Sequence, residues 1–195
     1  GIEYRHLDPV LDVAVKSGLK AIEITMNTDN APKLIQKAVK ISRGKVTVGV
    51  GTVLSTKDLK VALNSGAGFI VMPVLVEEVV AFCVKNHIPV FPGAFTPQEI
   101  YRAWVSGATM VKLFPVKFLG PGYIKEIKAP LEDVKILACG GVSADNLREY
   151  FLKGANAVSF GASVFRKDLL EEKNYRAIEE GIKKLIIKNI PLGYR

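Results

Sequence analysis

Met110-Val111-Lys112-Leu113-Phe114-Pro115 is a short apolar segment with one lysine in its middle. Gly107-Ala108 precede it, and its length and its Gly and Pro borders are typical of a buried parallel strand. An isolated charge is costly there, so the amine of Lys112 must be paired, reach water at the strand end, or be neutral. A neutral, desolvated lysine is a nucleophile that forms Schiff bases with ketones. A structural ion pair is the alternative interpretation.

The rest of the chain alternates between strand and helix patterns. Strands are predicted over residues 19–25, 45–51, 69–72, 88–91, 110–114, 135–139 and 157–160, and helices over 7–17, 31–41, 56–64, 75–85, 96–106, 121–128, 143–152 and 173–189. Strict alternation implies parallel strands with right-handed crossovers, either in a (β/α)8 barrel or in an open doubly wound sheet. No G-x-G-x-x-G opens an early helix, which favours the α/β class of (β/α)8 TIM barrels. Seven strands are counted and the chain starts on a helix, so we expect the first strand to precede Gly1. If no residues precede Gly1, the barrel would have a gap at strand one.

Composition narrows the class of protein. The 195 residues, 49% of them hydrophobic and 24% charged, are enough for one globular domain, and we expect residues 1–195 to form it. No apolar run is long enough to span a bilayer, which argues against a membrane partner. Cys83 and Cys139 form no C-x-x-C, which favours a reduced, cytoplasmic setting. No cluster of His, Cys and carboxylate residues has metal-ligand spacing, so no metal is expected.

The formal charge is +8, which suits an anionic small substrate. It would also suit nucleic acid, but the lysines are scattered and no basic run is interleaved with aromatic residues. The densest basic segment, Lys183 to Lys188, is typical of the solvated face of a last helix. The sequence therefore favours a small-molecule partner over nucleic acid.

Active sites of such barrels lie at the C-terminal ends of the strands. Strand side chains alternate, so Glu23 and Thr25 are expected to point into the barrel, and Lys112 and Phe114 share a face of their own strand. A carboxylate beside a buried amine is either its neutralising partner or a general acid/base for Schiff-base chemistry.

Two other strand ends carry candidate residues. Thr52 follows a strand, and its hydroxyl is positioned either to bind a substrate oxygen or to serve the turn. Pro73 also closes a strand end, and simple strand termination is its default role.

Two glycine turns follow the last two predicted strands. Gly140-Gly141 follows one, and Gly161-Ala162-Ser163 follows the other. Exposed backbone N–H groups and the start of a helix together make an anion cradle. Barrels often hold phosphate with the loops after their seventh and eighth strands.

With these residues in hand, the sequence resembles the 2-keto-3-deoxy-6-phosphogluconate (KDPG) and 4-hydroxy-2-oxoglutarate (KHG) aldolases. The resemblance rests on the segments 22–28, 48–54, 69–73, 92–96, 111–115, 139–143 and 161–163, in family order. It implies a homotrimeric barrel and a class I aldolase that needs no metal or other cofactor. By this resemblance Lys112 forms the Schiff base, Glu23 moves protons, and Thr52 helps to hold the pyruvate portion. The residues expected to bind substrate are Thr25, Asn27, Thr52, Pro73, Phe114, Gly140, Gly141, Gly161, Ala162 and Ser163.

The chain departs from the family pattern at several positions. Asn27 stands where the family usually has an arginine associated with the pyruvate carboxylate, and Cys139 stands where it has threonine. Val74 replaces a glycine after Pro73. Lys117 lies in the altered segment after Pro115 and is a candidate for the charge that Asn27 lacks.

The functional hypothesis is reversible cleavage of 2-keto-3-deoxy-6-phosphogluconate to pyruvate and glyceraldehyde 3-phosphate. One alternative is an aldolase for 4-hydroxy-2-oxoglutarate, the phosphogalactonate epimer or an unphosphorylated keto acid. A phosphosugar isomerase or decarboxylase on the same fold needs no imine. A non-catalytic binder of phosphorylated ligands, with Lys112 and Glu23 as a salt bridge, is the remaining alternative.

Overall fold

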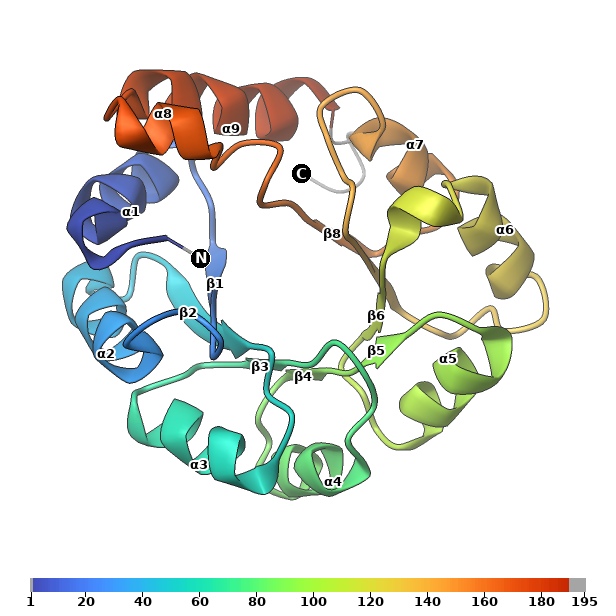
Figure 1. Ribbon diagram of the computed structural model, residues 1–195. Helices are drawn as coiled ribbons and strands as arrows, with labels where there is room; N and C mark the ends of the chain where they lie inside the picture. Colours follow the sequence, from blue (N-terminus) through green and yellow to red (C-terminus); the bar gives the residue numbers. More distant parts are fainter. Residues whose placement is uncertain (1, 190–195) are drawn as a thin grey trace.

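Parallel strands form a ring, and helices surround the ring on its outside (Figure 1). The computed structural model describes residues 2–189. The strands are β1 (Ala21–Thr25), β2 (Thr47–Gly51), β3 (Ile70–Val71), β4 (Val90–Phe91), β5 (Gly93–Ala94), β6 (Val111–Leu113), β7 (Ile136–Cys139) and β8 (Ala157–Ser159). The α-helices are α1 (Leu7–Lys16), α2 (Ala31–Ser42), α3 (Thr56–Asn64), α4 (Glu77–Lys85), α5 (Pro97–Val105), α6 (Gly122–Lys128), α7 (Leu147–Leu152), α8 (Lys167–Glu171) and α9 (Tyr175–Asn189). Two 3-10 turns, η1 (Tyr4–His6) and η2 (Val116–Phe118), complete the elements.

The hydrogen-bonded order is β1-β2-β3-β4 in one sheet and β5-β6-β7-β8 in the other, and every pair is parallel. β4 and β5 belong to one path that Pro92 interrupts, and the carbonyl of Pro92 accepts a hydrogen bond from the backbone N–H of Lys112 at 2.8 Å. The seven strands predicted from the sequence are therefore all present. The parallel α/β barrel is confirmed.

The ring is open between β8 and β1. Within residues 2–189 no ladder joins these two strands, and an apolar cleft of about 250 Å³ lies beside β8, lined in part by Leu19, Val158 and Leu185. The gap expected at strand one is therefore observed. The strand expected to fill it would precede Gly1 and lies outside the described residues.

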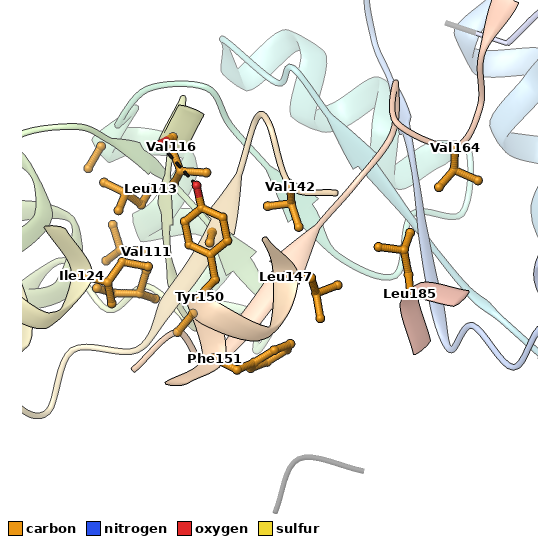
Figure 2. Close-up of a cluster of buried hydrophobic side chains, with 14 of the residues drawn as sticks. Val111, Leu113, Val116, Ile124, Val142, Leu147, Tyr150, Phe151, Val164 and Leu185 are labelled. Atoms are coloured by element: carbon orange, nitrogen blue, oxygen red, sulfur yellow. Dashed lines mark hydrogen bonds between the residues drawn. The ribbon is translucent and has the colours of Figure 1, made fainter. Parts of the chain in front are cut away.

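The outward faces of the strands pack against the helices. Val111 and Leu113 of β6 are fully buried, and they lie in a cluster with Ile124 of α6 and Tyr150 of α7 (Figure 2). Because side chains alternate along a strand, Lys112 between them faces the barrel interior. The hydrophobic core thus decides which way the lysine points.

Helix starts follow the local sequence in two cases and depart from it in one. Ser55 caps α3, and Thr96 opens α5 with a full capping box, as its sequence predicts. The helix predicted to begin at Ser143 begins only at Leu147. The side chain of Asn146 accepts from the N–H of Ser143 at 2.8 Å and donates to the carbonyl of Gly141 at 2.9 Å. These local bonds hold the segment as a turn.

Candidate active site

Lys112 is deeply buried at the centre of the ring. Its side chain is 7% exposed, and its Nζ lies 5.2 Å from the ring centroid of Phe114. The ion pairs formed within residues 2–189 do not include Lys112. A buried amine held by no carboxylate contact is available to a reacting carbonyl, so the interpretation of Lys112 as half of a structural salt bridge loses its support.

Glu23 reaches the same interior from β1. Burial raises the pKa of its carboxyl group, and the positive charge of Lys112 partly offsets that shift. The carboxyl group is therefore near enough to Lys112 to feel its charge, yet the two are not joined as an ion pair. This arrangement leaves space between an amine and a carboxyl group, and acid/base catalysis on a bound imine requires such a space.

Glycines make room for these side chains. Glu23 lies beside Gly49 in the β1–β2 register, and a Cβ on Gly51 would lie 1.6 Å from Glu23 Oε1. A Cβ on Gly49 would lie 2.1 Å from the ring of Phe69. Along β2, the valines therefore point outward into the hydrophobic core between the strands and the helices. The glycines that alternate with them face the inside of the barrel.

Two interior residues were missing from the predicted site. Burial raises the pKa of the Cys139 thiol, and smaller effects come from the charge of Lys112, a hydrogen bond with the Ser159 side chain and the charge of Glu23. Cys139 and Ser159 are register partners on β7 and β8. Strand alternation, applied to β7 and β8 as it was to β1, would have placed both inside.

The structure also places the residues at the ends of β1 and β2. Thr25 and Thr28 share a hydrogen bond between their hydroxyl oxygens at 3.0 Å. Asn27 is exposed, and its side chain forms no hydrogen bond with any other residue in the range 2–189. Thr52 has a φ of 57°, a left-handed conformation that is uncommon for a β-branched residue. Such backbone strain is often retained at binding sites.

Pro73 and Phe114 lie against glycines. A Cβ on Gly93 would lie 2.1 Å from the carbonyl oxygen of Pro73, so the end of β3 rests directly on β5. Phe114 is 37% exposed, and a Cβ on Gly140 would lie 2.9 Å from its ring. These contacts place Pro73 at one strand end and Phe114 beside the first glycine turn.

The two glycine turns come together at the ends of β7 and β8. The hydroxyl of Ser163 donates to the carbonyl of Val142 at 3.0 Å, which joins the turns. Gly140 and Gly141 have φ values of 85° and 108°. Among the hydrogen bonds of the described chain, none is donated by the five backbone N–H groups of Gly141, Val142, Gly161, Ala162 and Ser163. Free N–H groups in joined turns are suited to bind an anion.

The helix N-termini that the sequence analysis expected to contribute to anion binding do not lie at these turns. α7 begins at Leu147 and α8 at Lys167, several residues beyond the glycines, and both helices are short. The anion cradle therefore rests on turn N–H groups and not on helix ends. This corrects the sequence-based argument, which placed a helix at Ser143.

Within residues 2–189, no group of three or more His, Cys, Asp or Glu side chains is arranged to hold a metal ion. No helix found in residues 2–189 has the length and apolar character needed to cross a bilayer.

Comparison with known proteins assigns the family. The family model described as "KDPG and KHG aldolase" matches residues 3–181. The chain is 32% identical to a probable 2-dehydro-3-deoxy-6-phosphogalactonate aldolase of Rhizobium meliloti, over 85% of this chain and 79% of the relative. It is also 32% identical to a 2-dehydro-3-deoxy-phosphogluconate aldolase of Haemophilus influenzae, over 91% of this chain and 84% of the relative.

A solved structure named "Native KDPGal structure" superposes with a TM-score of 0.88 at 27% identity, covering 95% of this chain and 89% of that one. The family model spans most of the chain, and both curated relatives align over more than two thirds of it. The chain belongs to the KDPG and KHG aldolase family.

Proposed function

We propose that the protein is a class I aldolase that cleaves 2-keto-3-deoxy-6-phosphogluconate reversibly to pyruvate and glyceraldehyde 3-phosphate. The observation that carries the proposal is the amine of Lys112, which is buried in the barrel, belongs to none of the ion pairs of residues 2–189, and lies near enough to Glu23 for its charge to lower the pKa of that carboxyl group. A phosphosugar isomerase or decarboxylase that reacts without an imine has no need of such an amine. A passive salt bridge would hold the two groups in contact.

The first half of the reaction builds the imine. Neutral Lys112 attacks the C2 ketone of the substrate, and the resulting carbinolamine loses water to give a protonated imine. Glu23 supplies the proton that the departing hydroxide needs. Burial raises the pKa of the Glu23 carboxyl group toward neutral pH. A group whose pKa is close to the working pH can both donate and accept protons during turnover.

The second half breaks the carbon–carbon bond. Glu23, directly or through water, removes the proton of the C4 hydroxyl, and the C3–C4 electron pair moves into the imine. The products of this step are glyceraldehyde 3-phosphate and an enamine on Lys112. Protonation of the enamine at C3 and hydrolysis of the imine release pyruvate and free the amine.

The remaining site residues hold the two ends of the substrate. The pyruvate end of the substrate lies at the ends of β1 to β3, surrounded by Thr25, Asn27, Thr52 and Pro73. Phe114 borders Lys112. The free N–H groups of Gly141, Gly161, Ala162 and Ser163, beside Gly140, bind the phosphate.

The phosphogalactonate epimer is a second candidate substrate. It is favoured by the Rhizobium meliloti relative, whose identity of 32% equals that of the phosphogluconate relative. The two substrates differ only in the configuration of one hydroxyl, so kcat/KM on each epimer decides between them. 4-Hydroxy-2-oxoglutarate, which lacks the phosphate, belongs in the same panel.

Borohydride trapping tests the mechanism. With pyruvate and borohydride, we expect a reduced pyruvyl adduct in the intact mass and, after peptide mapping, on Lys112. The Lys112→Met variant should remain unlabelled, and Lys125→Met, which changes an exposed lysine of α6, should label like the parent. An unlabelled parent protein, under conditions that label a known aldolase, would refute the imine mechanism.

We also propose a homotrimer. Phe82 of α4 and Tyr101 and Val105 of α5 are 42%, 50% and 59% exposed, and apolar area of this kind is often covered by another subunit. Light scattering should give about three times the chain mass of 21.2 kDa. A mass of one chain at micromolar concentration would contradict this assembly.

A further inference from the structure

The anion cradle formed by the two glycine turns has five free N–H groups but little fixed positive charge of its own. The helices after it begin too far along the chain to contribute. Arg166, three residues after Ser163, pairs with Asp168, and Lys167 pairs with Glu171. A phosphate ester carries nearly two negative charges at neutral pH, so a free cation beside the cradle would strengthen its binding.

Lys117 lies directly against this cradle. Its backbone N–H donates to the carbonyl of Gly140 at 2.9 Å. A Cβ on Gly141 would lie 2.5 Å from the Cβ of Lys117, so the glycine is what lets the lysine stem rest on the turn. The start of the Lys117 side chain is therefore fixed at the edge of the anion site by two separate contacts.

The neighbouring residues hold this position in place. Val116, immediately before Lys117, is fully buried, and its carbonyl accepts a hydrogen bond from the buried hydroxyl of Tyr150 at 3.4 Å (Figure 2). The core thus anchors η2, while the side chain of Lys117 remains exposed. Its stem is positioned and its charged end is free to move.

The ammonium group is not committed elsewhere. The ion pairs of residues 2–189 leave Lys117 out. Its Nζ lies 4.8 Å from the ring centroid of Phe118, which is 72% exposed. A cation–π contact at such an exposed site is weak, so moving the ammonium group onto a bound anion costs little.

We propose that Lys117 is a specificity-determining residue that binds the terminal phosphate of the substrate and makes the site prefer phosphorylated keto acids. The proposal rests on the aldolase function above for its substrate, and on the contacts with Gly140 and Gly141 for its location. Those contacts place Lys117 at the phosphate end and not at the carboxylate end, where Asn27 lies. The recognised chemistry is a phosphate monoester dianion.

The kinetic test compares two substrates that differ only in the phosphate. Lys117→Met should lower kcat/KM for 2-keto-3-deoxy-6-phosphogluconate by about tenfold, the size of effect that losing one charge-assisted hydrogen bond produces. The same variant should leave kcat/KM for 2-keto-3-deoxygluconate and the pyruvate concentration for half-maximal trapping within about twofold of the parent. Lys117→Arg should recover most of the loss, and Lys125→Met controls for net charge. Equal losses on both substrates, or a change in pyruvate trapping, would overturn the phosphate assignment.

A binding measurement separates this proposal from the aldolase function. Inorganic phosphate, titrated calorimetrically, should bind the parent protein and Lys125→Met alike, and Lys117→Met several-fold more weakly, with all affinities falling as salt is added. If the parent shows no turnover but this difference holds, the phosphate role stands and the aldolase function fails. If Lys117→Met binds phosphate as well as the parent does, the role of Lys117 is wrong whatever the activity.

Discussion

The carboxyl group of Glu23 occupies the space that a side chain on Gly51 would need. A Cβ at that position would lie 1.6 Å from Glu23 Oε1 and 2.5 Å from its carboxyl carbon. Glu23 and Gly51 come from neighbouring parallel strands. The position of the proposed proton carrier therefore depends on a missing side chain one strand away.

Gly51→Ala tests this dependence. We expect kcat to fall by about 10²-fold or more, because the displaced carboxyl group no longer meets the imine. The overpacked interior should also lose about 1–3 kcal/mol of unfolding free energy. Gly122→Ala is the matched control, since a Cβ there meets nothing within 4 Å. Full activity in Gly51→Ala would show that Glu23 does not need its observed position.

Glu23→Gln tests the chemistry itself. The amide keeps the size of the side chain but neither gives nor takes protons, so we expect kcat to fall by about 10²–10⁴-fold. Glu126→Gln, on the exposed side of α6, should leave kcat unchanged. Steady-state assays on both variants measure kcat relative to the parent protein. A parent-like kcat in Glu23→Gln would remove Glu23 from the mechanism.

The raised pKa of Glu23 also predicts a pH-dependent stability. Burial raises this pKa above its ordinary value of 4.5, so between these two pKa values the folded protein holds a proton that the unfolded chain has released. By linkage, the contribution of Glu23 to stability falls as the pH rises from about 4.5 through its folded pKa. Glu23→Gln should therefore melt higher than the parent at neutral pH, with the difference shrinking toward pH 4. Thermal melts across this range check the sign, and a difference that grows on acidification would contradict it.

Asn27 offers a gain-of-function test. Its exposed side chain has no charge for the substrate carboxylate, and within residues 2–189 its amide group has no hydrogen-bond partner. Asn27→Arg should lower the pyruvate concentration for half-maximal trapping by roughly 3- to 10-fold, as expected for a charge-assisted hydrogen bond. Asn64→Arg, at the exposed end of α3, adds the same charge far from the strand ends. Equal behaviour of the two variants would place the carboxylate elsewhere.

The two cysteines should respond differently to alkylation. Burial raises the pKa of Cys83 to about 11, and it also raises that of Cys139, so both thiols should react slowly at pH 7. Cys83 is fully buried in the helix layer, whereas Cys139 is half-buried beside the barrel interior. Iodoacetamide at alkaline pH should modify Cys139 first and block pyruvate trapping, and Cys139→Ser should resist this inactivation. Modified Cys139 with unimpaired trapping would place its thiol outside the site.

Much of the fold follows from sequence periodicity. The apolar valines predict the strands β2 and β6, and the capping-box residues beginning at Thr96 predict the start of α5. The structure confirms all three elements. The continuation of the strand path as β5 beyond Pro92 and the late start of α7 were not predicted. They depend on a tertiary hydrogen bond from Lys112 and on the side chain of Asn146, which periodicity does not report.

The candidate site was predictable only in part, because only some of its residues stand out in the sequence. Lys112 and Glu23 stand out because charged residues are rare in apolar strands. Ser159 passes unnoticed, and Cys139 is noted only as a departure from the family pattern, because a hydroxyl and a thiol are ordinary in strands. Lys117 could be noted as unusual, but only the contact with Gly141 shows which end of the substrate it serves.

The glycines at positions 49, 51 and 93 carry a further consequence for how this barrel can change. At each position a Cβ would lie 1.6 to 2.1 Å from its nearest neighbour, which is a side chain at positions 49 and 51 and the backbone of Pro73 at position 93, so any substitution must displace that neighbour. Mutational libraries aimed at these strands should consequently yield almost only inactive clones. New substrate preferences must instead arise in the loops beyond the strand ends, where residues such as Asn27 and Lys117 vary at little cost to the barrel.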